Sequence, residues 1–164
     1  MNIRFPIRVM RQRDLDGILR VERASFGKDA YDRKLFAEYS NTCGSLFLVA
    51  QSRQRICGYS LTHARGDRAE LVSIAVDPPT RGKGVASALL ESTLRRLRRR
   101  KVTRVSLMVR TTNTAACQFY EKYEFTKVRV VHGYYEDGSD GYLMRKTLYS
   151  RNSPSATISA GPVR

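Results

Sequence analysis

The sequence has few of the residues that build disulfides and metal centres. Its 164 residues include three cysteines and two histidines. The cysteines are an odd number without CxxC or metal-ligand spacing, which argues against a disulfide framework and predicts reduced thiols at Cys43, Cys57 and Cys117. Neither His63 nor His132 has a partner carboxylate at a useful spacing, so we predict no chemistry for either histidine and no metal site.

Long apolar runs are also missing. No stretch approaches the roughly 18 apolar residues that a membrane-spanning helix needs. The opening residues, MNIRFPIRVM, are interrupted by charge and proline, unlike a secretion signal. We therefore predict a cytoplasmic protein with no membrane partner. A chain of this length suffices for one domain that buries about 70% of its unfolded surface. We predict this domain over residues 1–148, followed by a disordered tail over residues 149–164.

Acidic residues are scarce beside basic ones. The chain has 15 aspartates and glutamates against 30 lysines and arginines, a formal net charge of +15. Such a field favours anionic partners, for example an acidic peptide, RNA or the ribosome, but it also serves solubility alone. Much of the charge ends one predicted helix, at Arg95, Arg96, Arg98, Arg99, Arg100 and Lys101. There it suits the helix dipole, so a solvated helix end and a nucleic-acid contact both stay open.

Hydrophobic periodicity predicts a strand, two helices, three strands, a helix, a strand, a helix and two strands. Their predicted ranges are 7–10, 14–26, 32–39, 46–51, 56–63, 70–76, 85–100, 105–110, 111–120, 125–131 and 142–148. Asp14 and Asp32 are expected to cap the first two helices. The segment 70–76 is apolar on both faces, as a central strand covered on both sides requires. The order predicts an α/β fold, a mixed sheet with helices on both faces.

The loop between the strand at 70–76 and the following helix reads Arg81-Gly82-Lys83-Gly84-Val85-Ala86. Its glycines let backbone amides approach phosphate oxygens, and the helix N-terminus, Arg81 and Lys83 add positive potential. No Ser or Thr follows Gly82-Lys83, as a P-loop needs, and the third glycine of a dinucleotide fingerprint is missing. By itself the loop predicts an anion site, with a plain strand-to-helix turn as the alternative.

A second motif accompanies this loop. Val76-Asp77-Pro78 with Arg81 to Ala86 resembles the Q/R-x-x-G-x-G/A signature of the GNAT N-acetyltransferase superfamily, and Asn113 to Phe125 is similar to its N-x-x-A-x-x-x-Y-E-x-x-x-F segment. The resemblance covers about residues 7 to 148, and among subfamilies it favours the protein N-terminal acetyltransferases, including ribosomal-protein-alanine acetyltransferases. It implies the GNAT fold, with about seven strands splayed between the fourth and the fifth.

The resemblance also implies acetyl-CoA as cofactor and assigns residues to it. The backbone of Ile74, Ala75 and Val76 would hold the acetyl-pantetheine arm, and Asn113 the middle of the cofactor. The pyrophosphate would lie on the loop and helix start formed by Arg81, Gly82, Lys83, Gly84, Val85, Ala86 and Ser87. Tyr120 would sit beside the thioester sulfur as the general acid, since a phenol stays protonated at neutral pH.

The general base is harder to assign. Many relatives carry Glu or His at the position of Met108, and a thioether cannot accept a proton. By resemblance, Glu70 at the start of the central strand is the predicted base, with Glu22 or a water as alternatives. An α-amine with a pKa near 7.7 loses its proton at pH 7 for about 1 kcal/mol, whereas a lysine needs about 4.6 kcal/mol. A weak base therefore fits a protein N-terminus better.

Two loops would select the acceptor, and their predicted contact residues are Phe26, Gly27, Tyr31, Tyr134 and Tyr135. The predicted reaction is acetyl transfer by direct attack in a ternary complex on the N-terminal α-amine of a protein. Acetylation of a lysine or a small amine is the enzymatic alternative. A non-catalytic acetyl-CoA-binding or ribosome-associated module is the alternative from another class.

Overall fold

The computed structural model describes residues 5–148. The tail predicted over residues 149–164 lies outside them. The strands are β1 (Ile7–Val9), β2 (Phe47–Ser52), β3 (Arg55–Arg65), β4 (Arg68–Val76), β5 (Arg104–Arg110), β6 (Thr126–Val131) and β7 (Gly141–Thr147). The α-helices are α1 (Leu15–Phe26), α2 (Arg33–Cys43), α3 (Val85–Arg99) and α4 (Thr114–Lys122). The predicted element order is confirmed.

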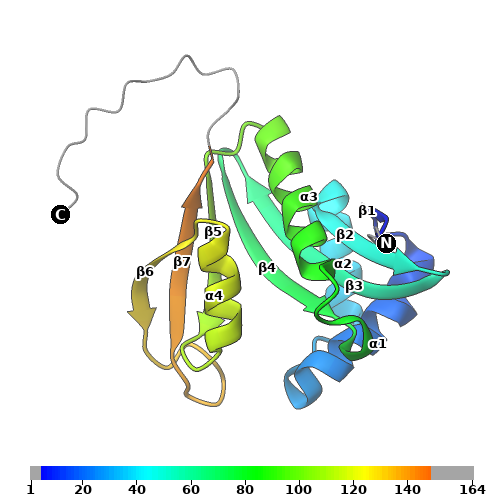
Figure 1. Cartoon of the computed structure of the whole chain (residues 1–164), viewed down its shortest axis with the longest axis horizontal. Helices are drawn as coiled ribbons and strands as arrows, with labels where there is room; N and C mark the ends of the chain where they lie inside the picture. Colours follow the sequence, from blue (N-terminus) through cyan, green and yellow to red (C-terminus); the bar gives the residue numbers. More distant parts are fainter. Residues whose placement is uncertain (1–4, 149–164) are drawn as a thin grey trace.

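Within the described residues the strands form one seven-stranded sheet in the order β1-β2-β3-β4-β5-β7-β6. Strands β4 and β5 are parallel and the other neighbours are antiparallel. The parallel pairing covers only Arg68–Leu71 opposite Arg104–Leu107, after which the two strands diverge (Figure 1). The predicted mixed sheet, splayed between the fourth and fifth strands, is confirmed.

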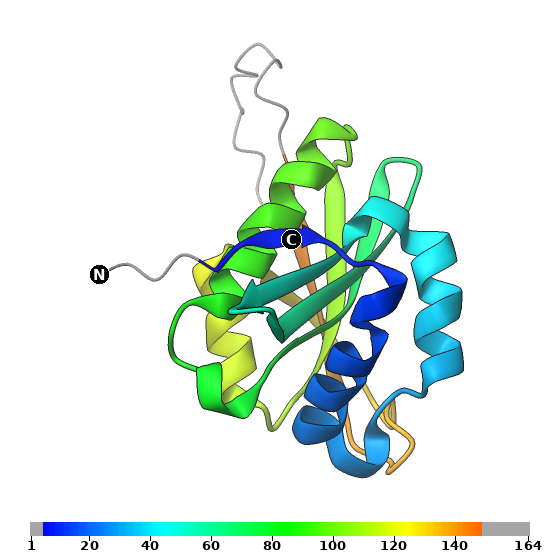
Figure 2. The ribbon, with the colours of Figure 1, turned by 90° about the vertical axis from the view of Figure 1, so that its right-hand side faces the viewer.

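The helices cover both faces of the sheet, as Figure 2 shows. Helices α1 and α2 pack on one face through a cluster that includes Ile18, Phe36 and Tyr59, each fully buried. Helices α3 and α4 pack on the other face, where the larger cluster includes Leu90, Leu97, Tyr120 and Phe125. Because β4 contributes side chains to both clusters, the apolar pattern that predicted a central strand has its physical reason here.

The two predicted helix caps have different outcomes. Asp32 caps α2, because its carboxylate accepts the Leu35 N–H at 2.9 Å. Asp14 occupies the cap position of α1 but does not cap it, so that prediction is wrong. Its carboxylate instead accepts the Arg11 N–H and pairs with Arg8, both at 2.7 Å. A neighbouring guanidinium offered this carboxylate a stronger, charge-assisted partner than a helix amide.

Two classes of feature are missing from residues 5–148. None of their helices has the length and apolar character to cross a bilayer. In the same part of the chain, His, Cys, Asp and Glu side chains nowhere gather in threes as a metal site would require. Cys43, Cys57 and Cys117 are buried and unbonded to one another in the described part of the chain.

Candidate active site

A cavity of about 1080 Å³ fills the space where β4 and β5 diverge. Its walls come from α1, β4, the β4–α3 loop, β5, α4 and the β6–β7 loop. The predicted site residues that line it are Phe26, Tyr31, Ile74, Ala75, Val76, Arg81, Gly82, Gly84, Val85, Ala86, Ser87, Asn113, Tyr120 and Tyr135. Four predicted residues do not line it: Gly27, Glu70, Lys83 and Tyr134. The cavity therefore joins the two sequence motifs and both acceptor loops.

The free edge of β4 forms one wall of the cavity. Beyond Leu71, β4 still pairs with β3 up to Val76 opposite Gly58, but it has left β5. In an antiparallel pair every second residue points its N–H and C=O away from the partner strand. Between Val72 and Val76 these groups therefore face the space that β5 has vacated. This part of β4 offers backbone hydrogen bonds to a ligand that lies in the cavity.

The β4–α3 loop has the geometry of an anion cradle. Gly82 and Gly84 have φ angles of +77° and +86°, a backbone region that side chains with a Cβ rarely adopt. No atom lies within 4 Å of the position that a Cβ would take at either glycine, so the space above the loop is open. No side chain caps the first amides of α3. These residues fit the pyrophosphate of the predicted cofactor, because unpartnered helix amides bind phosphate oxygens.

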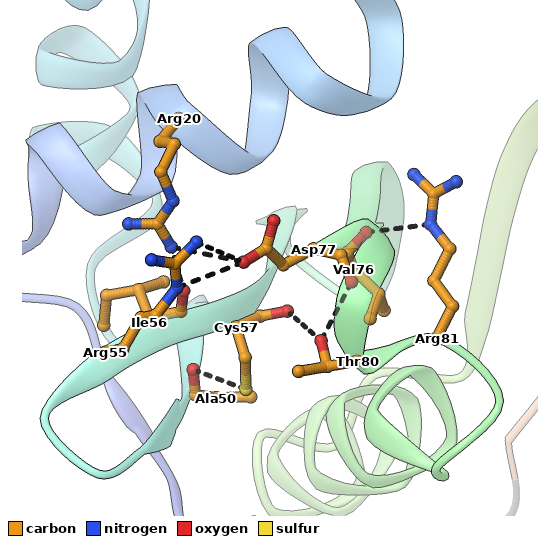
Figure 3. Close-up of polar contacts among 9 residues, drawn as sticks. All are labelled: Arg20, Ala50, Arg55, Ile56, Cys57, Val76, Asp77, Thr80 and Arg81. Atoms are coloured by element: carbon orange, nitrogen blue, oxygen red, sulfur yellow. Dashed lines mark hydrogen bonds and ion pairs between the residues drawn. The ribbon is translucent and has the colours of Figure 1, made fainter.

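This loop is held by a junction in which the buried Asp77 meets the more exposed Arg20 and Arg55, called the Asp77 junction below (Figure 3). Asp77 is 4% exposed and accepts ion pairs from Arg55 at 3.1 Å and Arg20 at 3.5 Å. Its N–H donates to the Cys57 carbonyl at 2.8 Å. One residue of the loop itself, Arg81, donates to the Val76 carbonyl at 3.0 Å. The loop is thus tied to α1, β3 and β4 before any ligand binds.

Helix α4 contributes the two predicted residues of the second motif. The Asn113 side-chain oxygen Oδ1 caps the helix by accepting the Ala116 N–H at 3.1 Å, which leaves the side-chain NH2 group for a ligand. Tyr120 is 7% exposed and packs edge-on against Phe125 at 5.7 Å between ring centroids. Burial raises the pKa of Tyr120 far above its usual value, with a smaller contribution from Tyr135. Its phenol is therefore a proton donor at the cavity wall at any physiological pH.

The far end of the cavity is held by an exposed cluster around Arg110, called the Arg110 junction below. Arg110, from β5, pairs with Asp29 of the α1–α2 segment at 3.5 Å and with Asp137 of the β6–β7 loop at 2.9 Å. Its guanidinium also lies 4.0 Å above the ring of Tyr135. The two loops predicted to select the acceptor are thus joined by one side chain.

Charge and burial at this end shift two pKa values. Burial and the neighbouring Tyr134 raise the pKa of Tyr135 to about 12, with Arg110 opposing them. Hydrogen bonds from Ser139 and Arg110 hold the pKa of Asp137 at about 2. Tyr134 packs edge-on against Tyr135, with ring centroids 5.0 Å apart, and is 47% exposed. It therefore supports the lining tyrosine from the outside of the cavity.

The candidate bases differ in position. Glu70 is exposed and sits opposite Ser106 where β4 and β5 are still paired, short of the cavity. Met108, on β5, lines the cavity. Glu22, on α1, borders the cavity and is 1% exposed, so it is the buried one of the two carboxylates. Burial raises the pKa of Glu22, and hydrogen bonds from Tyr31 and Tyr59 oppose that shift.

Three positions at the site were not found by motif. Ser73 and Arg110 line the cavity, and Tyr59 lies behind Ser73 with its hydroxyl 2.9 Å from the Ser73 oxygen. Arg110 is the last residue of the alternating pattern predicted over residues 105–110, so a charged strand end was the one available signal. No sequence signal links Ser73 to Tyr59, because their contact depends on the register between β3 and β4.

Comparison with known proteins bears on this geometry. The acetyltransferase (GNAT) family matches residues 15–125. The N-alpha-acetyltransferase of Saccharolobus solfataricus is 32% identical over 88% of this chain and 93% of that protein. The crystal structure of Ard1 from Thermoplasma volcanium superposes with a TM-score of 0.85 at 27% identity, covering 88% of this chain and 98% of Ard1. The crystal structure of the ribosomal-protein-S18-alanine N-acetyltransferase from Escherichia coli superposes with a TM-score of 0.79 at 26% identity, covering 92% of this chain and 99% of that protein.

Proposed function

Since this chain belongs to the acetyltransferase (GNAT) family, whose acyl donor is acetyl-CoA, we propose that it acetylates the N-terminal α-amine of a protein. The observation that carries this proposal is the cavity itself. It runs from the glycine loop of Gly82 and Gly84 to the aromatic mouth at Tyr31 and Tyr135, as a donor and a peptide end would require together. Relatives named for N-alpha and ribosomal-protein-alanine acetylation support a protein acceptor, including a ribosomal protein.

The proposed reaction is a direct attack of the amine in a ternary complex. Acetyl-CoA supplies an activated thioester carbonyl. A backbone N–H of the free β4 edge near Val76 stabilises the developing oxyanion, because it is fixed before the reaction begins. Tyr120 donates its proton to the departing sulfur, as its buried and protonated phenol allows. Phe26, Tyr31 and Tyr135 position the acceptor by contact with the first residues of the peptide.

The amine must also lose a proton. The sequence-based proposal for the acceptor of that proton is Glu70, which stands outside the lining and would act through a water. A weak base suffices for an α-amine, whose deprotonation at pH 7 needs about 1 kcal/mol. For the same reason, the absence of a basic atom at Met108 fits an α-amine acceptor better than a lysine acceptor.

Peptides with free and blocked N-termini test the proposal. The purified protein, given acetyl-CoA, should release CoA with an alanine-initiated peptide and not with the same peptide carrying a blocked N-terminus and one internal lysine. Mass spectrometry should locate the new acetyl group on the α-amine. Acetylation of the blocked peptide alone would shift the assignment to lysine. Binding of acetyl-CoA without turnover on any amine would identify a non-catalytic binding module.

A second proposal concerns contact with RNA, as on a ribosome, through a basic pole that we define as Arg65, Arg68, Arg98, Arg99, Arg100, Lys101 and Arg104. These residues flank the β3–β4 turn and the connection between the end of α3 and the start of β5, which are joined by a hydrogen bond from Thr103 N–H to the Asp67 carbonyl at 2.7 Å. All but Arg104 are exposed, and none forms an ion pair with another described residue.

The basic pole lies at the end of α3 away from the β6–β7 loop, so a bound RNA would leave the acceptor mouth accessible (Figure 1). Binding to a fluorescent RNA should weaken steeply with added salt, because each neutralised phosphate releases counterions. The double variant Arg98→Glu and Arg99→Glu should lose most of this binding and keep peptide acetylation. Equal RNA binding by the variant and the native protein would reject the basic pole as the contact.

A further inference from the structure

Glu22 is a buried carboxylate without a cation beside it. It is 1% exposed, and no ion pair joins it to a lysine, arginine or histidine of residues 5–148. Its partners are neutral: one oxygen accepts the Tyr31 N–H at 2.9 Å, and the other accepts the Tyr59 hydroxyl. Burying a charge in this way destabilises the fold unless something else compensates. Titratable groups that are buried beside a cavity and have a shifted pKa are frequent at functional sites.

A chain of hydroxyl groups connects this carboxylate to the cavity. Tyr59, on β3, is fully buried and donates to Glu22. Since its single proton is used in that bond, the Tyr59 oxygen acts as acceptor toward Ser73, whose oxygen is 2.9 Å away. Ser73 is half-buried and lines the cavity. Hydrogen bonds therefore run in one direction, from the cavity wall to the carboxylate.

A β-bulge produces this arrangement. The pairing of β3 with β4 jumps from Leu61 opposite Ser73 to Thr62 opposite Leu71, which leaves Val72 as an extra residue. An extra residue reverses the alternation of side chains beyond it. Val72 and Ser73 consequently both lie toward α1 and α2, where Tyr59 and Glu22 are. Without the bulge, the Ser73 hydroxyl would point to the opposite face of the sheet.

The rest of the lining offers few alternatives. Met108 has no atom that accepts a proton. The other acidic residues of the lining are Asp29, which pairs with Arg110, and Glu136, which is exposed on the β6–β7 loop. The titratable groups that face Glu22 are Tyr31 and Tyr59. Burial raises the pKa of both, and the negative charge of Glu22 contributes to raising it. Glu22 is thus the buried carboxylate through which a proton can leave the site.

We propose that Ser73, Tyr59 and Glu22 form a proton relay that accepts the proton of the acceptor amine. This inference rests on the proposed amine acetylation. The ammonium group gives one proton to the Ser73 oxygen, Ser73 passes its own proton to the Tyr59 oxygen, and Tyr59 passes its own to Glu22. The net change converts the ammonium to an amine and the Glu22 carboxylate to a carboxylic acid. Ser73 contacts the substrate, whereas Tyr59 and Glu22 act through it as positioning residues.

The relay predicts a specific pH signature. With the relay intact, the enzyme takes up the abundant ammonium form of a peptide and removes its proton. With the relay broken, only the neutral amine reacts, and at pH 6.5 this is roughly 6% of an α-amine with a pKa near 7.7. Glu22→Gln should therefore lower kcat/KM about tenfold or more at pH 6.5, and less than about twofold at pH 9. A loss caused by structural damage alone would be similar at both pH values.

The experiment measures kcat/KM for an alanine-initiated peptide between pH 6 and 9.5. The variants are Glu22→Gln, Tyr59→Phe and Ser73→Ala, with Tyr39→Phe as the matched control. Tyr39 packs in the same cluster but does not line the cavity. Thermal unfolding and acetyl-CoA binding report the integrity of each variant, and Ser73→Ala, at a half-buried serine, keeps the test available if a deeper variant does not fold. A second peptide, initiated by trifluoroalanine with a less basic amine, should restore the activity of the relay variants near neutral pH.

The outcomes are distinguishable. Loss at low pH in the three relay variants, with the control unchanged and rescue by the less basic peptide, supports the relay. A native pH profile in Glu22→Gln, or the same acid-side loss in Glu70→Gln alone, overturns it. Failure of the native protein to acetylate any peptide contradicts the proposed acceptor instead. The pH dependence of kcat/KM is then measured for the same variants with the amine that the native protein does acetylate.

Discussion

Two arginine–aspartate junctions hold opposite ends of the cavity, and they differ in the burial of their aspartates, since Arg20 and Arg55 are themselves 39% and 58% exposed. At the cofactor end, the Asp77 side chain is 6% exposed. At the acceptor end, the side chains of Arg110, Asp29 and Asp137 are 29%, 49% and 46% exposed. Water and salt screen exposed pairs, so these are worth little, while a buried aspartate that loses its partners is strongly unfavourable. We therefore expect the cofactor end to be formed before a ligand binds. We expect the acceptor mouth to open at a small cost in free energy.

Tyr120 belongs to neither junction and provides the largest expected effect. Tyr120→Phe should lower kcat by about 100- to 10,000-fold, the range lost with a general acid, because the departing sulfur then has no proton donor. Binding of acetyl-CoA, measured by calorimetry, should stay within about twofold. Tyr142→Phe, at a tyrosine outside the cavity lining, is the control. Unchanged kcat in Tyr120→Phe would show that another group protonates the sulfur.

The preformed cofactor end can be broken at its glycine. Gly84→Val forces a β-branched residue to φ +86°, so the loop must move and KM for acetyl-CoA should rise about 10- to 100-fold. Gly66→Val is a matched control, because Gly66 has φ +61°, equally open surroundings and a place in the distant β3–β4 turn. The control should lose similar stability and keep the native KM. An equal rise of KM in both variants would contradict a specific role for the loop.

The two junctions can be compared by the same substitution. Asp77→Asn should lower the free energy of unfolding by about 1–3 kcal/mol, because it leaves two guanidinium groups without their buried partner. Asp137→Asn, at an exposed and solvent-screened pair, should leave the free energy of unfolding unchanged within experimental error. Urea denaturation measures both. Similar losses in the two variants would remove the distinction between a buried and an exposed junction.

The acceptor mouth should respond to Arg110. Arg110→Ala should raise KM for a peptide about 3- to 10-fold and leave acetyl-CoA binding unchanged, since two loops lose their common partner. High salt should imitate the variant. Mild acid should not, because Asp137, with a pKa of about 2 instead of 3.8, contributes stability above pH 3.8 that is lost only as the pH falls through about 2. Arg129→Ala, at an exposed arginine of β6, is the control.

The smallest expected effect is the change in thermal stability when Glu22 is replaced, and its sign differs from the others. Burial raises the pKa of Glu22 above 4.5, so the folded protein binds more protons than the unfolded chain between 4.5 and the raised value. Stability from this group therefore falls as the pH rises through that window. Glu22→Gln should melt about 2–4 °C above the native protein at pH 7 and converge with it near pH 4. A lower Tm for the variant at pH 7 would contradict an uncompensated buried charge.

Local patterns were sufficient for much of the fold. The apolar residues on both faces of segment 70–76 predicted a central strand close to β4, and the three- and four-residue spacing of apolar positions in 85–100 predicted a helix close to α3. The glycines at 82 and 84 predicted a loop between the strand and the helix, and both have the positive φ angles that glycine adopts readily. These features depend on contiguous residues, whose backbone preferences act over one or two turns of chain.

The direction in which a side chain points could not be predicted from the motifs alone. Lys83 and Tyr134 belong to predicted site loops, yet they point outside the cavity lining, because motif membership fixes a position and not an orientation. Glu70 was placed at the right strand but ahead of the point where β4 leaves β5. Asn113 was assigned to the cofactor, and its oxygen also caps α4.

The amino-acid sequence by itself determined the order of the elements, the glycine loop between β4 and α3 and the family motif, since each depends on neighbouring residues. Only the tertiary structure decided which side chains meet across the cavity. Arg110 reaches two loops far apart in sequence, and Ser73 reaches Tyr59 because one extra residue turns the strand. The physical reason is that register, bulge and strand divergence are set by packing of the whole sheet, and no local segment carries that information.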